Sequence, residues 1–148
     1  MNRLIQCLCV ALLALAAAAI PVSCSKASHN GDLDGQWQVM QVVSGGEDVV
    51  FPEGEIYYYN FYLHTFQLTY TGKRSIRMTG NMIYDEADGR LALELGFVKA
   101  GRVSKELLDR LPYWGMSASG EDVMRIEELT SSRLVMRHDD VTIICRKF

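Results

Sequence analysis

The chain has 148 residues and a formal net charge of −3, with 15 Lys and Arg against 18 Asp and Glu. A mildly acidic chain without a basic stripe is a poor nucleic-acid binder, because neutralisation of phosphates drives that affinity. We therefore expect no nucleic-acid partner. The length suits a single domain with a substantial core.

The first 23 residues have the pattern of a secretory signal peptide. Arg3 is the only charged residue in this segment, and residues 4–20 are almost continuously apolar. Pro21 and Ser23 end the apolar run just before Cys24. A membrane-spanning helix needs about 20 apolar residues, so this shorter run favours a cleaved signal over a permanent span.

Ser23 and Cys24 resemble the cleavage site of bacterial lipoproteins. The resemblance implies cleavage before Cys24 and attachment of lipid to its thiol. Pro21 departs from the pattern, in which an aliphatic residue usually stands three positions before the cysteine. We expect an exported protein, lipid-anchored through Cys24 to the bacterial cell envelope at the outer membrane. Ordinary signal-peptide cleavage nearby is the alternative.

Three segments follow from this interpretation: a signal peptide at 1–23, a flexible tether at 24–32 and a folded domain at 33–148. The tether has almost no apolar content and cannot bury itself. The remaining cysteine, Cys145, lies in an apolar run. If Cys24 carries lipid, Cys145 has no disulfide partner, and we interpret it as a buried structural thiol.

The folded segment is predicted to consist of short strands separated by turn residues. Phe66, Leu68 and Tyr70 alternate with polar residues, and Asp88-Gly89 is a strong hairpin signal. Gly80, inside a strand pattern, predicts a bulge or a sharp bend. Strands are predicted at residues 36–43, 56–62, 65–71, 76–84, 91–95, 123–129, 133–138 and 141–147.

One helix is expected between the fifth and sixth strands. Ser104 can cap it, Leu107 and Leu108 form an apolar edge, and Pro112 ends it. Short links between consecutive strands favour antiparallel neighbours. The predicted fold class is therefore all-β: an eight-stranded antiparallel up-and-down barrel with one short helix between strands five and six.

Gly35-Gln36-Trp37, at the start of the first predicted strand, resembles the Gly-x-Trp signature of lipocalins. The domain as a whole is similar to the lipocalin-like domains of small bacterial lipoproteins. The resemblance implies that Gly35 and Trp37 plug one end of the barrel and that Arg146, on the last strand, packs over the indole ring. It also implies non-covalent binding of small apolar molecules inside the barrel.

Strand phase predicts which side chains point inward. These residues either fill the barrel as a core or line an apolar, ligand-binding cavity; their bulk in so small a domain favours the core. A second hypothesis places the tyrosines of residues 57–70 in solvent, as a platform for a sugar or a partner protein. The candidate ligand-binding residues inside the barrel are Tyr58, Phe66, Leu68, Met78, Met82, Leu93, Met124, Ile126 and Met136.

Catalytic motifs are absent from the sequence: there is no Gly-x-Ser-x-Gly, His-Glu-x-x-His, P-loop or dinucleotide fingerprint. His64 and His138 have no partner at metal-ligand spacing, and acids such as Asp122 fall at turns, where solvated carboxylates are expected. We therefore expect no enzymatic activity, no cofactor and no metal.

The leading hypothesis is a membrane-anchored lipocalin-like lipoprotein that binds a small apolar or amphipathic ligand non-covalently. The alternative is an accessory cell-envelope lipoprotein whose packed barrel acts as a protein- or glycan-interaction module, with an envelope protein as its partner.

Overall fold

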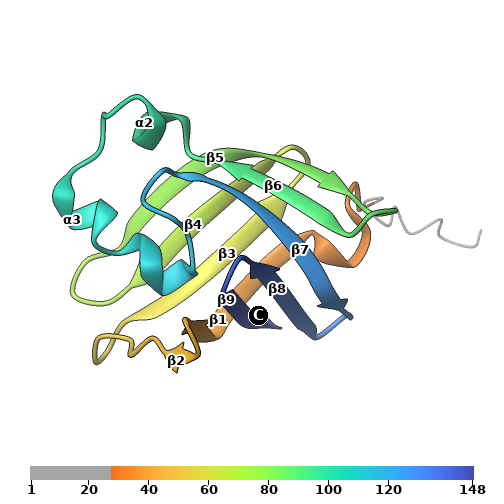
Figure 1. Ribbon diagram of the computed structural model, residues 1–148, viewed down its shortest axis with the longest axis horizontal. Coiled ribbons are helices and arrows are strands. Elements are labelled where there is room, and N and C mark those ends of the chain that lie inside the picture. Colours follow the sequence, from red (N-terminus) through yellow and green to blue (C-terminus); the bar gives the residue numbers. More distant parts are fainter. Residues whose placement is uncertain (1–27) are drawn as a thin grey trace, which may run out of the picture.

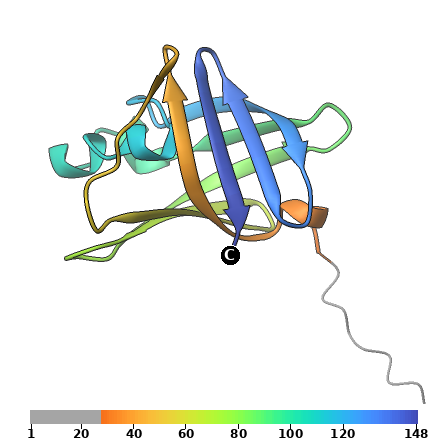
Figure 2. The same ribbon diagram turned by 90° about the horizontal axis from the view of Figure 1, so that it is seen from below.

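The computed structural model describes residues 28–148, so the predicted signal peptide and the predicted lipidation site at Cys24 lie outside the described residues. Within residues 28–148, nine antiparallel strands form one sheet that closes on itself (Figures 1 and 2). The elements are η1 (Gly31–Leu33), β1 (Gly35–Ser44), β2 (Glu47–Asp48), β3 (Ile56–Tyr62), β4 (Thr65–Thr71), β5 (Ile76–Asp85), β6 (Arg90–Glu94), α2 (Gly96–Lys99), α3 (Lys105–Leu108), η2 (Leu111–Trp114), β7 (Glu121–Leu129), β8 (Arg133–His138) and β9 (Val141–Lys147).

The strands neighbour one another in chain order, and the first long strand pairs with the last. β1 pairs with β3 at its start and with β9 along its whole length, from Trp37 opposite Lys147 to Ser44 opposite Val141. β2 is a two-residue strand that extends only the end of β1. The remaining eight strands form the closed barrel, which confirms the predicted fold class. Closure leaves these strands without the exposed edges that invite aggregation.

The prediction of a single helix between the fifth and sixth strands needs correction. The structure contains one strand more than predicted, the two-residue β2, so the helical connection lies between β6 and β7. The sequence did not reveal β2 because two residues show no periodicity. The connection holds two short α-helices and the 3-10 turn η2, and Pro112 lies inside η2 rather than after a longer helix. Ser104 does cap α3, since its Oγ accepts a hydrogen bond from the Leu107 N–H at 3.4 Å.

Antiparallel order sends successive connections to opposite ends of the barrel. The connections β1–β3, β4–β5, β6–β7 and β8–β9 lie at one end, which we call the helical end because α2, α3 and η2 lie across it (Figure 1). η1 and the remaining hairpins lie at the other end, which we call the Trp37 end (Figure 2).

The alternation of apolar and polar residues along β4 and β6 correctly predicted which side chains are buried. Phe66, Leu68 and Tyr70 are buried, as are the leucines of β6. No register shift occurs at Gly80, so the predicted bulge is absent there; bulges lie instead in β1 between Val39 and Gln41 and in β7 between Ile126 and Glu128. Gly80 is required for a different reason: a Cβ there would lie 2.5 Å from the Phe66 ring and 2.4 Å from a main-chain oxygen of β6.

Large aromatic side chains fill the barrel. Trp37, Trp114 and Tyr59 are fully buried, and Tyr59 stacks on Phe61 with 5.5 Å between ring centroids. This packing favours the filled core over a large internal cavity. It also removes the hypothesis of an exposed tyrosine platform, because the tyrosines of β3 and β4 are buried except for Tyr62.

The chain folds onto the barrel before the predicted domain boundary at residue 33. Asn30 is buried, and its side-chain amide donates to Asp34 Oδ1 at 2.6 Å and to the Leu63 carbonyl at 2.9 Å. The last residues of the predicted tether are therefore part of the domain. Among the described residues, no helix combines the length and the apolar character needed to cross a bilayer.

Candidate functional site

The Trp37 end is sealed by the residues around the Gly-x-Trp segment. The Trp37 indole is fully buried, and its Nε1–H donates to the Leu33 carbonyl of η1 at 2.8 Å. The cation above the indole is Lys147, whose Nζ lies 4.3 Å from the ring centroid. Its alkyl chain lies beside Gly35, where a Cβ would come within 3.1 Å of it. Gly35 and Trp37 therefore take the positions predicted for a barrel plug.

The prediction that Arg146 packs over Trp37 is wrong. In the β1–β9 register Trp37 faces Lys147, whereas Arg146 faces Gln38 and so points to the outside. There Arg146 donates two hydrogen bonds to Gln38 Oε1, at 3.0 and 2.8 Å. Because side chains alternate between the two faces of a strand, an offset of one residue exchanges the inner face for the outer one.

The predicted ligand-binding residues are located in two different places. The prediction that Tyr58 points into the barrel is wrong. Tyr58 lies opposite Gln38 on the outer face, where its ring contacts that of Phe148 with 5.3 Å between centroids. The other eight point inward and belong to the core, with Ile126 only partly buried. Their role as ligand contacts stays a prediction. They are Phe66, Leu68, Met78, Met82, Leu93, Met124, Ile126 and Met136.

A polar cluster that the sequence did not indicate lies at the helical end. Glu55 Oε2 accepts hydrogen bonds from the Tyr57 hydroxyl and from Arg110 Nη1, and Arg110 Nη1 is 3.0 Å from the Tyr57 oxygen. We call Glu55, Tyr57 and Arg110 the mouth site. Tyr57 is fixed in the β3–β4 ladder and Arg110 precedes η2, whereas Glu55 lies in the turn before β3.

The two charged side chains of the mouth site are partly buried. The Arg110 and Glu55 side chains are 20% and 16% exposed. Burial opposes ionisation of Glu55, but the hydrogen bonds from Tyr57 and Arg110 outweigh it and hold the pKa of Glu55 below its usual value. Burial and the neighbouring carboxylate raise the pKa of Tyr57, so its hydroxyl stays a donor. The cluster thus holds one anion against one cation at neutral pH.

Arg110 has donor capacity that the mouth site does not use. Its Nε–H is buried and has no acceptor among the described residues. A buried donor without a partner costs about 1–3 kcal/mol. The guanidinium also lies 4.4 Å above the Tyr70 ring, a cation–π contact that holds it in place.

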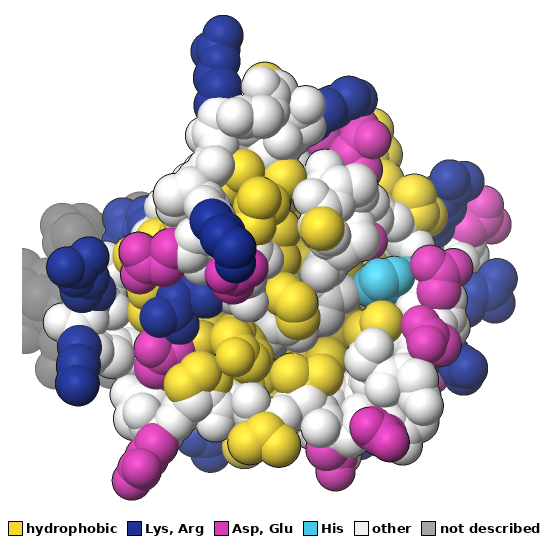
Figure 3. Space-filling view, turned by 60° about the vertical axis from the view of Figure 1, so that its left-hand side comes forward, with side chains coloured by type: hydrophobic (Ala, Val, Ile, Leu, Met, Phe, Trp, Pro, Cys, Tyr) yellow, Lys and Arg dark blue, Asp and Glu magenta, His cyan; other side chains and the backbone are white. Residues whose placement is uncertain are grey.

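Aromatic rings and a hollow lie beside the mouth site. Phe51 stacks on Tyr57 at 5.6 Å, and Tyr113 lies 5.1 Å from the same ring; both are only partly buried. The hollow has a volume of about 580 Å³ and lies between the turn before β3, the β4–β5 turn and the side of α3 and Arg110. Tyr70 is its only aromatic lining residue, and its charged lining residues are Glu53, Glu55, Lys73, Arg74, Glu106 and Arg110. In Figure 3, which turns the side carrying α3 forward, hydrophobic side chains gather in the middle of the face and charged side chains surround them.

His138 and Asp122 attach the helical connection to the barrel. The His138 Nε2 lies 2.6 Å from the Gly115 carbonyl, and Asp122 Oδ2 accepts from the Ser117 N–H at 2.9 Å. His138 Nδ1 is 3.8 Å from Asp122. Both side chains are largely buried, so Asp122 is not the solvated carboxylate that the sequence suggested, and His138 lies at the end of β8 beneath the helical connection.

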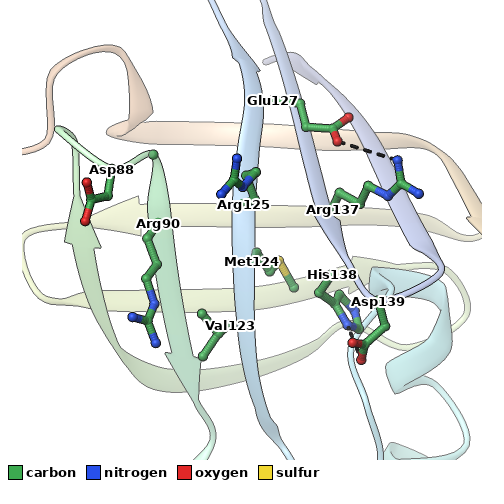
Figure 4. Close-up of a pocket in the computed structure, with 10 residues that line it drawn as sticks. Asp88, Arg90, Val123, Met124, Arg125, Glu127, Arg137, His138 and Asp139 are labelled. Atoms are coloured by element: carbon green, nitrogen blue, oxygen red, sulfur yellow. Dashed lines mark ion pairs between the residues drawn. The ribbon is translucent and has the colours of Figure 1, made fainter.

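A second hollow, of about 680 Å³, lies on the outside of β6, β7 and β8 (Figure 4). Arg90, Arg125 and Arg137 stand directly opposite one another on the three strands. Of these three arginines, only Arg137 has an ion pair within 4 Å in the described part of the chain, with Glu127 at 3.7 Å. Asp88, Glu127 and Asp139 also line the hollow, so its charges are balanced overall.

The described residues offer little for covalent or metal chemistry. Burial raises the pKa of the Cys145 thiol, which is therefore not a ready nucleophile. Among residues 28–148, no three His, Cys, Asp or Glu side chains converge in a group that could hold a metal ion. What the mouth site can do is bind a charged or amphipathic molecule without bond formation.

An antiparallel barrel that closes on itself, with the buried Trp of a Gly-x-Trp segment at one end, defines a lipocalin-like domain. A family model described as a lipocalin-like domain matches residues 16–148, and the chain belongs to that family. No curated protein matches the chain significantly.

Two solved structures share the fold. A lipocalin-like protein from Bacteroides uniformis is 24% identical, with a TM-score of 0.61 over 80% of this chain and 100% of that one. An uncharacterized protein from Bacteroides eggerthii is 19% identical, with a TM-score of 0.60 over 78% of this chain and 99% of that one.

Proposed function

We propose that the protein is a lipid-anchored lipocalin-like lipoprotein that binds a small amphipathic ligand at the helical end of its barrel. The observation that carries this proposal is the hollow of about 580 Å³ beside the mouth site, which is lined mainly by charged side chains and adjoins a cluster of aromatic rings around Tyr57. Small-molecule sites typically occupy 300–1,000 Å³ and combine apolar walls with a small number of fixed polar groups.

The location of the site differs from the interior cavity that the sequence suggested. Trp114 and the aromatic residues of β3 and β4 fill the barrel below the mouth. The partly exposed rings of Phe51 and Tyr113 remain available to a ligand at the rim. An amphipathic molecule fits this arrangement better than a wholly apolar one, because three cationic and three acidic side chains line the neighbouring hollow: Lys73, Arg74, Arg110, Glu53, Glu55 and Glu106.

The binding proposal is tested by thermal unfolding of the purified protein with a panel of amphiphiles and fluorophores. A ligand that binds only the native state raises the melting temperature, by an amount that grows with concentration above Kd. We expect single-chain amphiphiles to raise Tm. An unchanged Tm across the panel would contradict ligand binding and favour the alternative of an interaction module, for which the outer arginine row of β6–β8 is the candidate surface.

Anchoring is tested separately, by replacing the predicted lipidation site. Cys24→Ser removes the thiol to which lipid would be attached, and we expect the variant to move from the membrane fraction to the soluble envelope fraction. The natural protein, fractionated in parallel, is the control. Unaltered membrane retention of the variant would show that Cys24 carries no anchoring lipid.

A further inference from the structure

The mouth site already holds a carboxylate in the way that a binding site would. Glu55 Oε2 accepts from the Tyr57 hydroxyl and from Arg110 Nη1, so one oxygen takes two donors from different parts of the fold. Arginine with a neutral hydroxyl is a strong donor set for carboxylates, because charge-assisted hydrogen bonds are about twice as strong as neutral ones.

The donors are held by contacts with the barrel, whereas the acceptor belongs to a turn. Tyr57 pairs with Tyr70 in the β3–β4 ladder, and Arg110 is held over the Tyr70 ring. Glu55 belongs to the turn that begins at Pro52, where its N–H donates to the Pro52 carbonyl at 3.2 Å. Movement of this turn would release the carboxylate while the donors remain in position.

The guanidinium has a donor that Glu55 does not use. The Nε–H of Arg110 is buried without an acceptor in the described part of the chain, and the hollow of the mouth site adjoins the Arg110 side chain. A carboxylate that is free of the chain can align with two N–H groups of the guanidinium, whereas Glu55 contacts only Nη1.

We propose that Arg110 and Tyr57 form a carboxylate subsite in which Glu55 acts as an internal competitor, and that the ligand is an amphiphile with a carboxylate head. The inference rests on the proposed function, since it names the head group of the same ligand. The head exchanges with Glu55 at Arg110, and the apolar part lies against the aromatic rings at the rim.

The test compares three probes by thermal shift and titration: dodecanoate below its micellar concentration, 1-dodecanol below its solubility limit, and acetate. Dodecanoate should bind at least about tenfold more tightly than 1-dodecanol, because a hydrogen bond to a charged group supplies the difference. Acetate tests whether the head group alone suffices, and we expect it to bind far more weakly than dodecanoate. Equal affinities of dodecanoate and 1-dodecanol would overturn the carboxylate subsite while leaving the proposed function intact. Binding of neither dodecanoate nor 1-dodecanol would contradict the proposed function itself.

Four variants assign the effect to named residues. Arg110→Gln should remove the preference for dodecanoate over 1-dodecanol, while Arg77→Gln, which removes an exposed cation of β5 outside the hollow, should preserve it. Glu55→Gln removes the competing anion and should tighten dodecanoate binding by about tenfold, since a site that is occupied internally binds in proportion to its free fraction. If Arg110→Gln does not fold, the dodecanoate affinities of Glu55→Gln and Tyr57→Phe test the proposal instead. Unchanged dodecanoate affinity in both would overturn the proposal.

Discussion

Trp114→Ala should lower the free energy of unfolding by about 3–5 kcal/mol, which is the usual cost of truncating a fully buried tryptophan. Trp114 is 0% exposed although it belongs to the connection between β6 and β7, outside the barrel strands. Its ring packs edge-on against Tyr57 at 4.8 Å, and its Nε1–H donates to the Tyr58 carbonyl at 3.0 Å. The alanine variant would lose this burial and leave a β3 carbonyl without its donor.

Urea denaturation of the natural protein and the variant measures this loss. Tyr113→Ala is the matched control, because Tyr113 is the preceding residue of the same turn but is only partly buried. It should cost clearly less than Trp114→Ala. A cost below about 1 kcal/mol for Trp114→Ala would mean that the connection does not enter the core, and the barrel would then contain a cavity where the aromatic packing places a ring.

The barrel strands could be predicted from the sequence because each has a local signature. Phe66, Leu68 and Tyr70 alternate with polar residues, and turn residues such as Asp88-Gly89 separate the segments. Closure followed from eight sequential strands, and the structure confirms it through the pairing of β1 with β9. The Gly-x-Trp segment could also be recognised from the sequence, because its residues are contiguous.

The mouth site could not be predicted because its residues are adjacent only in three dimensions. Glu55 and Arg110 are 55 residues apart and belong to two connections without periodicity. Glu55, before a strand, and Arg110, after a helix, look like ordinary solvated charges in a one-dimensional sequence. Tyr57 belongs to a run of three tyrosines whose strand phase was ambiguous, and that ambiguity placed Tyr58 inside the barrel in error.

The same limit explains the error at Arg146. The resemblance to lipocalins placed a cation over Trp37, and one is present, but it is Lys147. Two basic residues follow one another at the end of the chain, so the choice between them depends on a cross-strand register that the sequence does not reveal.

Gly115→Ala should destabilise the protein by about 2–4 kcal/mol, because two costs coincide at this position. Gly115 follows η2 in a left-handed conformation with φ 69°, which costs an L-residue about 1–2 kcal/mol. A Cβ there would also lie 2.5 Å from Cγ1 and 2.7 Å from Cδ1 of Ile143, a fully buried residue of β9. Either the connection or β9 must shift to accommodate it.

Gly101→Ala is the matched control for this prediction. Gly101 has φ 68° in the same connection, but a Cβ there meets no atom within 4 Å. The control therefore carries the backbone cost alone, and the difference in unfolding free energy between the two variants isolates the contact with Ile143. Equal losses would show that the connection yields easily at η2. A larger loss for Gly115→Ala would show that the contact with Ile143 and the His138 hydrogen bond fix this segment against the barrel.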